Sequence, residues 1–201
     1  DKPKPTSVTP DPASDNMQEV LRTAILAQQQ ALALLQQTEA AYARLIPHQL
    51  LKLLNIDSVV DIKLGDQIER KMTIMFADIR NFTPISESMT PSENFEFINS
   101  YLSQMEPVVS AHHGIIDKYM GDAIMSLFSQ GADDALVAAI AMLARLEAYN
   151  DGRKRAGYVP IDIGIGLNPG MVMMGTVGGA ERMGSTVIGD AVNLTPRIEQ
   201  A

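Results

Sequence analysis

The sequence contains no cysteine, and this absence excludes disulfide bonds, thiolate metal sites and cysteine nucleophiles. Positive charge is scarce: 16 Lys and Arg residues stand against 24 Asp and Glu residues, and the formal net charge is −8. A chain with this balance is a poor electrostatic partner for nucleic acid or for an anionic membrane surface. We therefore expect no nucleic-acid partner, and any contact with phosphate groups must be local.

Long apolar runs are also missing. No segment approaches the roughly 20 consecutive apolar residues that a helix needs to cross a bilayer. We expect a cytoplasmic location, with any membrane tether supplied by another part of a longer parent protein. The first residue is Asp rather than Met, which indicates that the chain is a piece of such a parent. Of the 201 residues, 46% are apolar, which is enough for one sizeable core and an appendage.

Four regions differ in composition. Residues 1–16 are rich in Pro, Ser, Thr and Asp and predict a disordered linker. Residues 17–46 are rich in Ala, Leu and Gln, contain no Gly or Pro, and predict a helical stalk. Residues 47–70 combine a short apolar helix with a turn-rich connector, which we interpret as a transducing joint. Residues 71–201 then form a domain of catalytic size.

The predicted stalk carries a weak coiled-coil pattern. From Leu21 to Leu45, selected positions step by three and four residues in alternation, which is the a/d spacing of a coiled coil. Half of these positions hold Ala, Gln or Thr rather than large apolar residues. Two interpretations therefore stay open, a marginal dimeric coiled coil and a solvated amphipathic helix.

Two acidic residues stand at the ends of apolar, strand-like runs. Asp78 lies in TIMFADIRNFT and Asp122 lies in DKYMGDAIMSLF. If the two strands are neighbours, the carboxylates converge on one site, and their hard oxygen atoms suit Mg²⁺ or Mn²⁺. Because Mg²⁺ is commonly bound together with substrate phosphates, the pair indicates nucleotide chemistry. Either Asp alone is more typical of a helix cap or a turn.

Two amphipathic helices are predicted between the strands. The first begins after Thr90 and Pro91, and the second is capped by Asp133 and Asp134. Between them, His112 to Gly114 predict a turn, followed by two strands hinged at Met120 and Gly121. A further strand is predicted from Tyr158 to Leu167. The apolar faces expected in the core are Phe95, Ile98, Leu102 and Met105 on the first helix, and Leu136, Ile140, Leu143 and Leu146 on the second.

The last part of the sequence is rich in glycine. It does not match a dinucleotide fingerprint, because Pro169 stands where the third glycine after Gly164 and Gly166 is needed. No P-loop pattern is present either. A final helix carries Asn193 and Arg197, which share one face and could meet one anionic ligand together, although such a pair is usually an ordinary surface feature.

Taken together, the segments resemble the class III nucleotidyl cyclases, which comprise the adenylyl and guanylyl cyclase catalytic domain. The resemblance covers residues 72–199, in family order, and RLIPHQLLKLL is similar to the transducing segment of bacterial members. It implies a ferredoxin-like α/β (α+β) core with βαββαβ order, acting as a head-to-tail homodimer with two active sites at its interface. The segments that carry it are FADIRNFT, IIDKYMGDAIMSLF, IGIGLNPGMVMMGTVGG and TVIGDAVNLTPRIE.

The family resemblance implies a two-metal active site. Asp78, Asp122 and the backbone carbonyl of Ile79 would bind two Mg²⁺ or Mn²⁺ ions, which activate the ribose 3′-hydroxyl and brace the triphosphate. The 3′-oxygen attacks the α-phosphate, and pyrophosphate leaves. Backbone amides at the start of a helix would hold the terminal phosphates. These amides lie near Asn81, Phe82 and Thr83.

The partner subunit would complete each site. The resemblance assigns Lys118 and Thr186 to the purine, Asn193 to the ribose, Arg197 to the α-phosphate and Arg182 to a further phosphate. Lys118 can donate to adenine N1, whereas guanylyl enzymes usually carry an acidic residue there. The expected function is therefore an adenylate cyclase that makes 3′,5′-cyclic AMP from ATP in intracellular signal transduction, downstream of a sensor domain in the parent chain.

Two alternatives remain. One is a guanylate cyclase, and the other is a catalytically weak regulatory or dimerisation module. The second arises because the family domain continues beyond the point that corresponds to Ala201 and usually includes a phosphate-binding Lys, so we expect this chain to be incomplete at its C-terminus. A diguanylate cyclase is not supported, because no GGDEF-like sequence surrounds Asp122.

Overall fold

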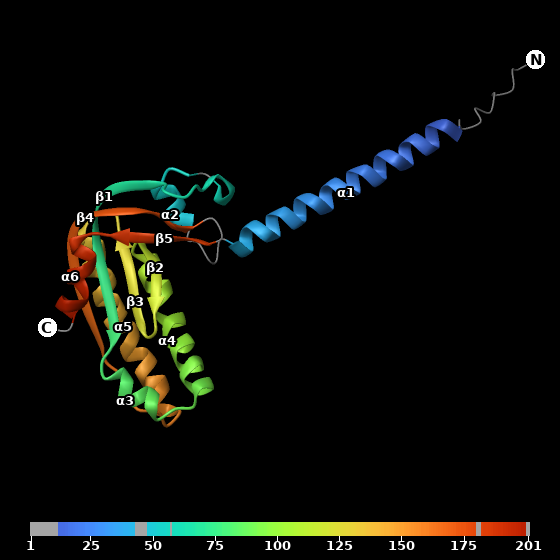
Figure 1. Ribbon diagram of the computed structural model, residues 1–201. Coiled ribbons are helices and arrows are strands. Elements are labelled where there is room, and N and C mark those ends of the chain that lie inside the picture. The colour runs from blue at the N-terminus through green and yellow to red at the C-terminus, as the bar shows by residue number, and fades with distance from the viewer. Residues whose placement is uncertain (1–11, 43–47, 57, 180–181, 200–201) are drawn as a thin grey trace, which may run out of the picture. The chain divides into compact units, whose positions relative to one another are not determined.

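The computed structural model describes residues 12–42, 48–56, 58–179 and 182–199 (Figure 1). The chain divides into two units, Asp1–Leu45 and Ile46–Ala201. In the first unit, helix α1 spans Pro12–Tyr42, and its side chains from Asn16 to Ala41 are all exposed. None of the described helices is both long enough and apolar enough to cross a membrane.

Helix α1 begins before the predicted start at residue 17. Pro12 is its first residue, a position where proline is favoured because its missing N–H would have no helical partner anyway. Residues 12–16 are thus helical and do not belong to the predicted linker, whereas residues 1–11 and 43–46 lie outside the described residues. Leu21 and Leu35 stay more than half exposed, and the coiled coil stays a prediction.

The second unit is built on one antiparallel sheet of five strands in the order β2-β3-β1-β4-β5. The long central strands β1 (Gln67–Ile79) and β4 (Ile163–Gly179) pair from Gln67↔Gly175 to Ile79↔Ile163. β3 (Ala123–Phe128) pairs with the other side of β1. The two edge strands are β2 (Gly114–Met120) and β5 (Arg182–Ile188).

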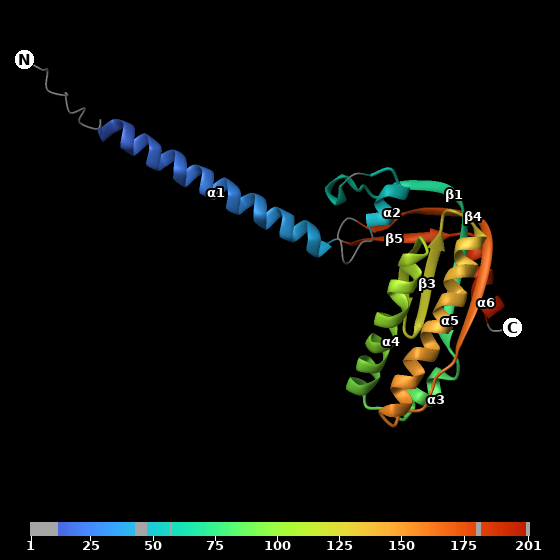
Figure 2. The ribbon, with the colours of Figure 1, turned by 180° about the vertical axis from the view of Figure 1, so that it is seen from behind.

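The helices lie on both faces of the sheet. α4 (Pro91–Ala111) and α5 (Ala132–Arg155) stand in front of it in Figure 2 and enclose the larger core. α6 (Asp190–Glu199) packs on β4 and β1 at a second, smaller core, which also receives Leu53 of α2 (His48–Leu53). The short helices η1 (Val59–Asp61) and α3 (Phe82–Glu87) lie in connections. This arrangement confirms the expected βαββαβ order.

The predicted start of α4 and the predicted hinge are present. Thr90 accepts a hydrogen bond from the Glu93 amide and forms a capping box with that residue, which fixes the start of α4. The β2–β3 hairpin turns at Gly121, whose φ is +66°. His113, with φ of +61°, lies in the turn before β2. These features were predictable because they depend on short stretches of sequence.

The predicted cap of α5 was wrong. The helix begins at Ala132, and its N-cap residue is Gly131, which has no side chain to accept a capping hydrogen bond. Asp133 and Asp134 lie inside the first turn of α5, where their negative charge is favourable beside the positive end of the helix dipole.

The predicted core faces of both long helices were wrong in part. Phe95 is 70% exposed, and α4 instead buries a four-residue stripe. On α5, Leu136 and Ile140 are exposed, because alanines turn toward the sheet and let the helix lie close to it. The strand predicted from Tyr158 begins only at Ile163 and continues through the glycine-rich run. The buried hydrophobic residues are Phe97, Tyr101, Met105 and Val109 on α4, and Ala135, Ala138, Ala139, Met142 and Leu146 on α5.

Candidate active site

The two predicted acids meet at one backbone amide. Asp78 is the penultimate residue of β1, and Asp122 lies in the turn between β2 and β3. The N–H of Ile79 donates to Asp78 Oδ1 at 3.0 Å and to Asp122 Oδ2 at 3.2 Å. The pairing of β1 with β3 brings the carboxylates together, because Ala77 lies opposite Ile124 in that register.

The electrostatics of the pair fit a cation site. Burial, followed by the hydrogen bond and the negative charge of Asp78, raises the pKa of Asp122 to about 7. A cation between two such carboxylates would relieve their repulsion. Within the described residues, no group of three or more His, Cys, Asp or Glu side chains lies close enough together to hold a metal ion by itself. The residues present therefore fit a metal that shares its coordination with backbone and substrate oxygen atoms.

Tyr101 is a neighbour of the acid pair that the sequence did not reveal. Its side chain is fully buried, and its hydroxyl has no hydrogen-bond partner in the part of the chain that the structure describes. Burial raises the pKa of the Tyr101 hydroxyl, and the charges of Asp122 and Asp78 raise it further, so the hydroxyl stays protonated. Only the packing of α4 on the sheet places Tyr101 there.

The backbone after β1 turns sharply into α3. Asn81 is the N-cap residue, with φ of 55° and ψ of 36°, in the left-handed region that Asn tolerates better than most residues. Its side chain forms no capping hydrogen bond. The next residue, Phe82, stacks on Phe97 with ring centroids 6.4 Å apart. Asn81, Phe82 and Thr83 thus lie in one turn that begins three residues after Asp78.

Lys118 lies on edge strand β2, just after a bulge. The β2–β3 register shifts between Ile116 and Lys118, and Asp117 is the extra residue. The Asp117 side chain is fully buried, and Lys118 Nζ lies 3.1 Å from its Oδ2. Neither Asp117 oxygen has a hydrogen bond of regular geometry, and burial raises the pKa of this carboxyl, opposed by Lys118. Asp117 therefore holds the lysine ammonium from one side.

Strand β5 carries two further predicted residues. Thr186 pairs with Gly175 of β4 and is partly buried, whereas Arg182 is exposed at the start of the strand and pairs with Gly179. Neither forms a side-chain hydrogen bond or an ion pair with the acid pair among the described residues. β2 and β5 are the two edge strands, so Lys118 and Thr186 lie on strands that each lack a partner on one side.

Helix α6 presents the last two predicted residues to solvent. Ala191, Thr195 and Glu199 are buried at four-residue intervals and face the sheet. Asn193 and Arg197 lie midway between them, share the opposite face and are exposed. The structure therefore confirms their common face but does not bring them into contact with Asp78 or Asp122 of the same chain.

The glycines of β4 have a structural role. A Cβ at Gly166 would lie 2.6 Å from the Thr195 carbonyl oxygen, and one at Gly170 would lie 2.7 Å from the Ala191 Cβ. These glycines let α6 lie directly on the strand, which explains why the glycine-rich run did not match any nucleotide-binding fingerprint. Residues so far apart in the sequence gave no local sign of this contact.

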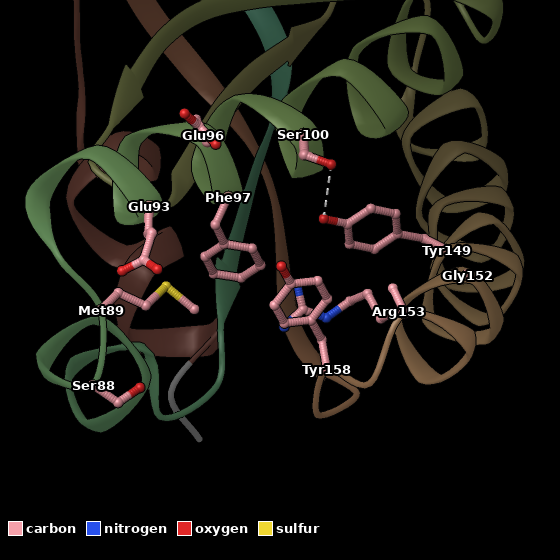
Figure 3. Close-up of a pocket in the computed structure, with 11 residues that line it drawn as sticks. Ser88, Met89, Glu93, Glu96, Phe97, Ser100, Tyr149, Gly152, Arg153 and Tyr158 are labelled. Carbon is pink, nitrogen blue, oxygen red and sulfur yellow. Dashed lines mark hydrogen bonds between the residues drawn. The ribbon is translucent and has the colours of Figure 1, made fainter.

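A hollow of about 530 Å³ lies between α4 and the end of α5, and neither Asp78 nor Asp122 lines it (Figure 3). The Arg153 guanidinium is buried in it, 4.5 Å from the Phe97 ring centroid and 5.5 Å from that of Tyr158. Its Nε donates to the carbonyl of Val159. Because these contacts hold the connection from α5 to β4, we interpret the hollow as structural. It contains none of the predicted site residues.

The fold and the acid pair agree with the comparisons to known proteins. The family profile described as "Adenylate and Guanylate cyclase catalytic domain" matches residues 65–201. The chain belongs to this family of nucleotidyl cyclase catalytic domains. The membership that the four ordered motifs predicted is thereby confirmed.

Relatives with both kinds of activity are similar to the chain. An adenylate cyclase of Anabaena cylindrica is 44% identical over 170 residues, which cover 82% of this chain and 34% of that protein. The crystal structure of the guanylyl cyclase Cya2 is 37% identical, with a TM-score of 0.61 over 66% of this chain and 71% of that one. A bacterial light-regulated adenylyl cyclase is 25% identical, with a TM-score of 0.74 over 88% of this chain and 52% of that one. The chain spans about a third of the Anabaena protein.

Proposed function

We propose that this chain is the catalytic part of an adenylate cyclase, which converts ATP to 3′,5′-cyclic AMP and pyrophosphate in signal transduction. The observation that carries the proposal is the convergence of Asp78 and Asp122 on the Ile79 amide. Two carboxylates held at one point by the backbone are the minimal protein contribution to a metal and triphosphate site.

Asp78, Asp122 and the backbone carbonyl of Ile79 would hold two Mg²⁺ or Mn²⁺ ions. When bound, such ions lower the pKa of the ribose 3′-hydroxyl and neutralise charge on the triphosphate. The protein supplies orientation: the Ile79 N–H holds one oxygen of each carboxylate. Backbone amides around Asn81, Phe82 and Thr83 would receive the terminal phosphates.

The remaining residues would serve a site shared by two copies of the chain in a head-to-tail dimer. Asn193 would orient the ribose, and Arg197 would stabilise the charge that develops on the α-phosphate. Their exposure on α6, away from their own acid pair, supports a role toward a second copy. Arg182 would add a phosphate contact.

Lys118 and Thr186 would select the base. The Lys118 ammonium can donate to adenine N1, and its contact with Asp117 limits the directions in which it can point. A guanine edge offers a donor at the corresponding position and would suit an acidic residue better. This reasoning favours ATP over GTP.

The test is a product assay on the purified protein, including any residues that its gene encodes beyond Ala201. ATP and GTP are each incubated with Mg²⁺ or Mn²⁺, and the cyclic product is identified by mass spectrometry. We expect cyclic AMP. Cyclic GMP alone would overturn the base assignment and identify a guanylate cyclase, whereas no cyclic product with either metal would overturn the enzymatic function.

A second experiment tests the shared site. Asp78→Ala and Arg197→Ala chains are each expected to be inactive, and mixing them should restore one composite site in each heterodimer. That site would use the acids of the Arg197→Ala chain and the α6 of the Asp78→Ala chain. Confirmed heterodimers without activity would contradict the shared site.

A further inference from the structure

We infer that Arg80 and Glu199 form a positioning pair that couples the two active sites of the dimer. The inference rests on the proposed function, because it needs sites shared between two chains. Arg80 is the first residue after β1, the strand that holds Asp78, and Glu199 is the last residue of α6, two residues after Arg197. Within one chain, the pair therefore joins the acids of one site to the helix that serves the other.

Arg80 contacts Glu199 at two different groups. Its Nη1 lies 2.9 Å from the Glu199 carboxylate Oε1, and its Nη2 donates to the Glu199 backbone carbonyl at 2.6 Å. The guanidinium thus binds both the side chain and the main chain of one residue. Charge-assisted contacts of this kind are stronger and more directional than neutral ones.

Both partners are held in place. The Arg80 amide donates to the Asp162 carbonyl at 2.8 Å, just before β4. The Glu199 side chain is only 3% exposed, whereas that of Arg80 is 44% exposed. Among the described residues Arg80 is the ion-pair partner of the Glu199 carboxylate, and this buried carboxylate cannot move without losing that partner. The end of α6 is therefore tied to the turn after Asp78.

Strand β4 has a glycine, Gly164, where it meets the Arg80–Glu199 pair. A Cβ at Gly164 would meet the Glu199 carboxylate and would lie 2.5 Å from Arg80 Cζ, so a side chain at this position would displace the pair from its present place. Gly164 lies opposite Asp78 in the β1–β4 register. The pair is therefore built into the strand that lies beside the metal-binding acid.

The Arg80–Glu199 pair connects the movement of α6 to the acid pair of the same chain. The Ile79 amide holds both carboxylates, and Arg80 is the next residue. Movement of α6 that repositions Arg197 would pull on Arg80 and hence on the Asp78–Asp122 pair of the same chain. Because these two groups belong to different sites in a head-to-tail dimer, closure of one site would be transmitted to the other.

The first test uses homodimers. Glu199→Gln keeps the size and the backbone carbonyl but removes the charge, and Arg80→Lys keeps the charge but loses the two-point contact. We expect kcat to fall about tenfold or more in each, with KM changed less than about threefold, as for loss of a charge-assisted contact. Glu147→Gln, an exposed position on α5, is the matched control and should keep the original kcat. Unchanged kcat in both folded test variants would overturn the inference.

The decisive test uses the heterodimer of an Asp78→Ala chain and an Arg197→Ala chain, which has a single active site, called here the live site. Glu199→Gln is added either to the chain that supplies the acids or to the chain that supplies α6. We expect kcat to fall by a similar factor in both placements, with thermal unfolding of the two heterodimers within a few degrees. An effect confined to the chain that supplies α6 would show local support of that helix and overturn the coupling.

A third experiment keeps the inference testable if Glu199→Gln does not fold. Arg80→Lys is added to the Asp78→Ala chain, whose own metal site is already disabled, so it can reach the live site only through α6. We expect kcat to fall, and unchanged kcat would overturn the coupling. An inactive parental heterodimer would instead contradict the shared site of the proposed function, and the coupling with it.

Discussion

The amide of Ile79 donates a hydrogen bond to the carboxylate of Asp122, a residue 43 positions later in the chain. The same amide also donates to the carboxylate of Asp78, so one N–H group is hydrogen-bonded to both acids on which the proposed chemistry depends. Strand β1 ends at Ile79, and the antiparallel β2–β3 hairpin delivers Asp122 beside it.

Removal of either carboxylate should abolish catalysis without unfolding the domain. We expect Asp78→Asn and Asp122→Asn each to lower kcat/KM at least about 100-fold, because several kcal/mol of metal-borne charge stabilisation is lost. The measurement is cyclic nucleotide formation at saturating Mn²⁺. Asp61→Asn, an exposed residue of η1, is the control and should stay fully active. Activity within threefold of the original in both acid variants would contradict the site.

Stability should fall with rising pH in the metal-free protein, because of Asp122. The folded state raises the pKa of Asp122 from 3.8 to about 7, so the folded protein holds this proton more tightly than the unfolded chain does. Stability is therefore lost as pH rises from about 4 to about 7. Since the carboxylate is only half-buried, solvent screening leaves an effect on the order of 1 kcal/mol.

The check is chemical denaturation at pH 5 and pH 8 without metal. Asp122→Asn should lose less stability between these values than the original protein, and Asp61→Asn should lose the same amount as the original. Added Mg²⁺ should raise the melting temperature more at pH 8 than at pH 5, because the cation competes with the proton. An original protein that gains stability relative to Asp122→Asn as pH rises would show the opposite sign and refute the assignment.

Lys118→Glu should change base selectivity. The new carboxylate would lie beside the buried Asp117, where the lysine ammonium now stands 3.1 Å away. We expect ATP turnover to fall at least about tenfold and the ratio of GTP to ATP turnover to rise, because the donor to the adenine edge is lost. Competition between the two nucleotides, followed by mass spectrometry of the products, measures the ratio. An unchanged ratio would refute the role of Lys118.

Gly166→Ala should displace α6. The added methyl group would lie 2.6 Å from the Thr195 carbonyl and 2.8 Å from the Glu199 amide, and overpacking of this kind costs about 1–3 kcal/mol. Gly152→Ala in α5 is a matched control, because a Cβ there meets nothing within 4 Å and should stabilise the helix by up to about 1 kcal/mol. Denaturant unfolding compares the two. Equal stability of both variants would contradict the close packing of α6 on β4.

Much of the site was predictable because its signals are local. A carboxylate after an apolar strand, a glycine hinge before Asp122 and an Asn able to adopt left-handed backbone depend on a few neighbouring residues. The motif order added the family, which the profile match confirms. The roles of Lys118, Thr186, Asn193 and Arg197 toward a substrate stay predictions.

Other features could not be predicted, because they depend on residues that are distant in the chain. Phe95 and Ile140 have the apolar character of core residues, but α4 buries the face of Tyr101 instead, and α5 buries a face rich in alanine. Tyr101 reached the acid pair only through the packing of α4 on the sheet. Arg80 and Glu199 stand 119 residues apart, and neither carries a local sign of the other.

The sequence by itself determined the turns, the capping box of α4 and the chemical types of the candidate ligands, since each follows from backbone preferences and side chains over short distances. Only the tertiary structure decided that two carboxylates share the Ile79 amide, and that Arg197 faces away from them on a helix tied to Arg80. These relations depend on sheet register and on helix packing, which are set by the sum of many weak contacts across the whole domain.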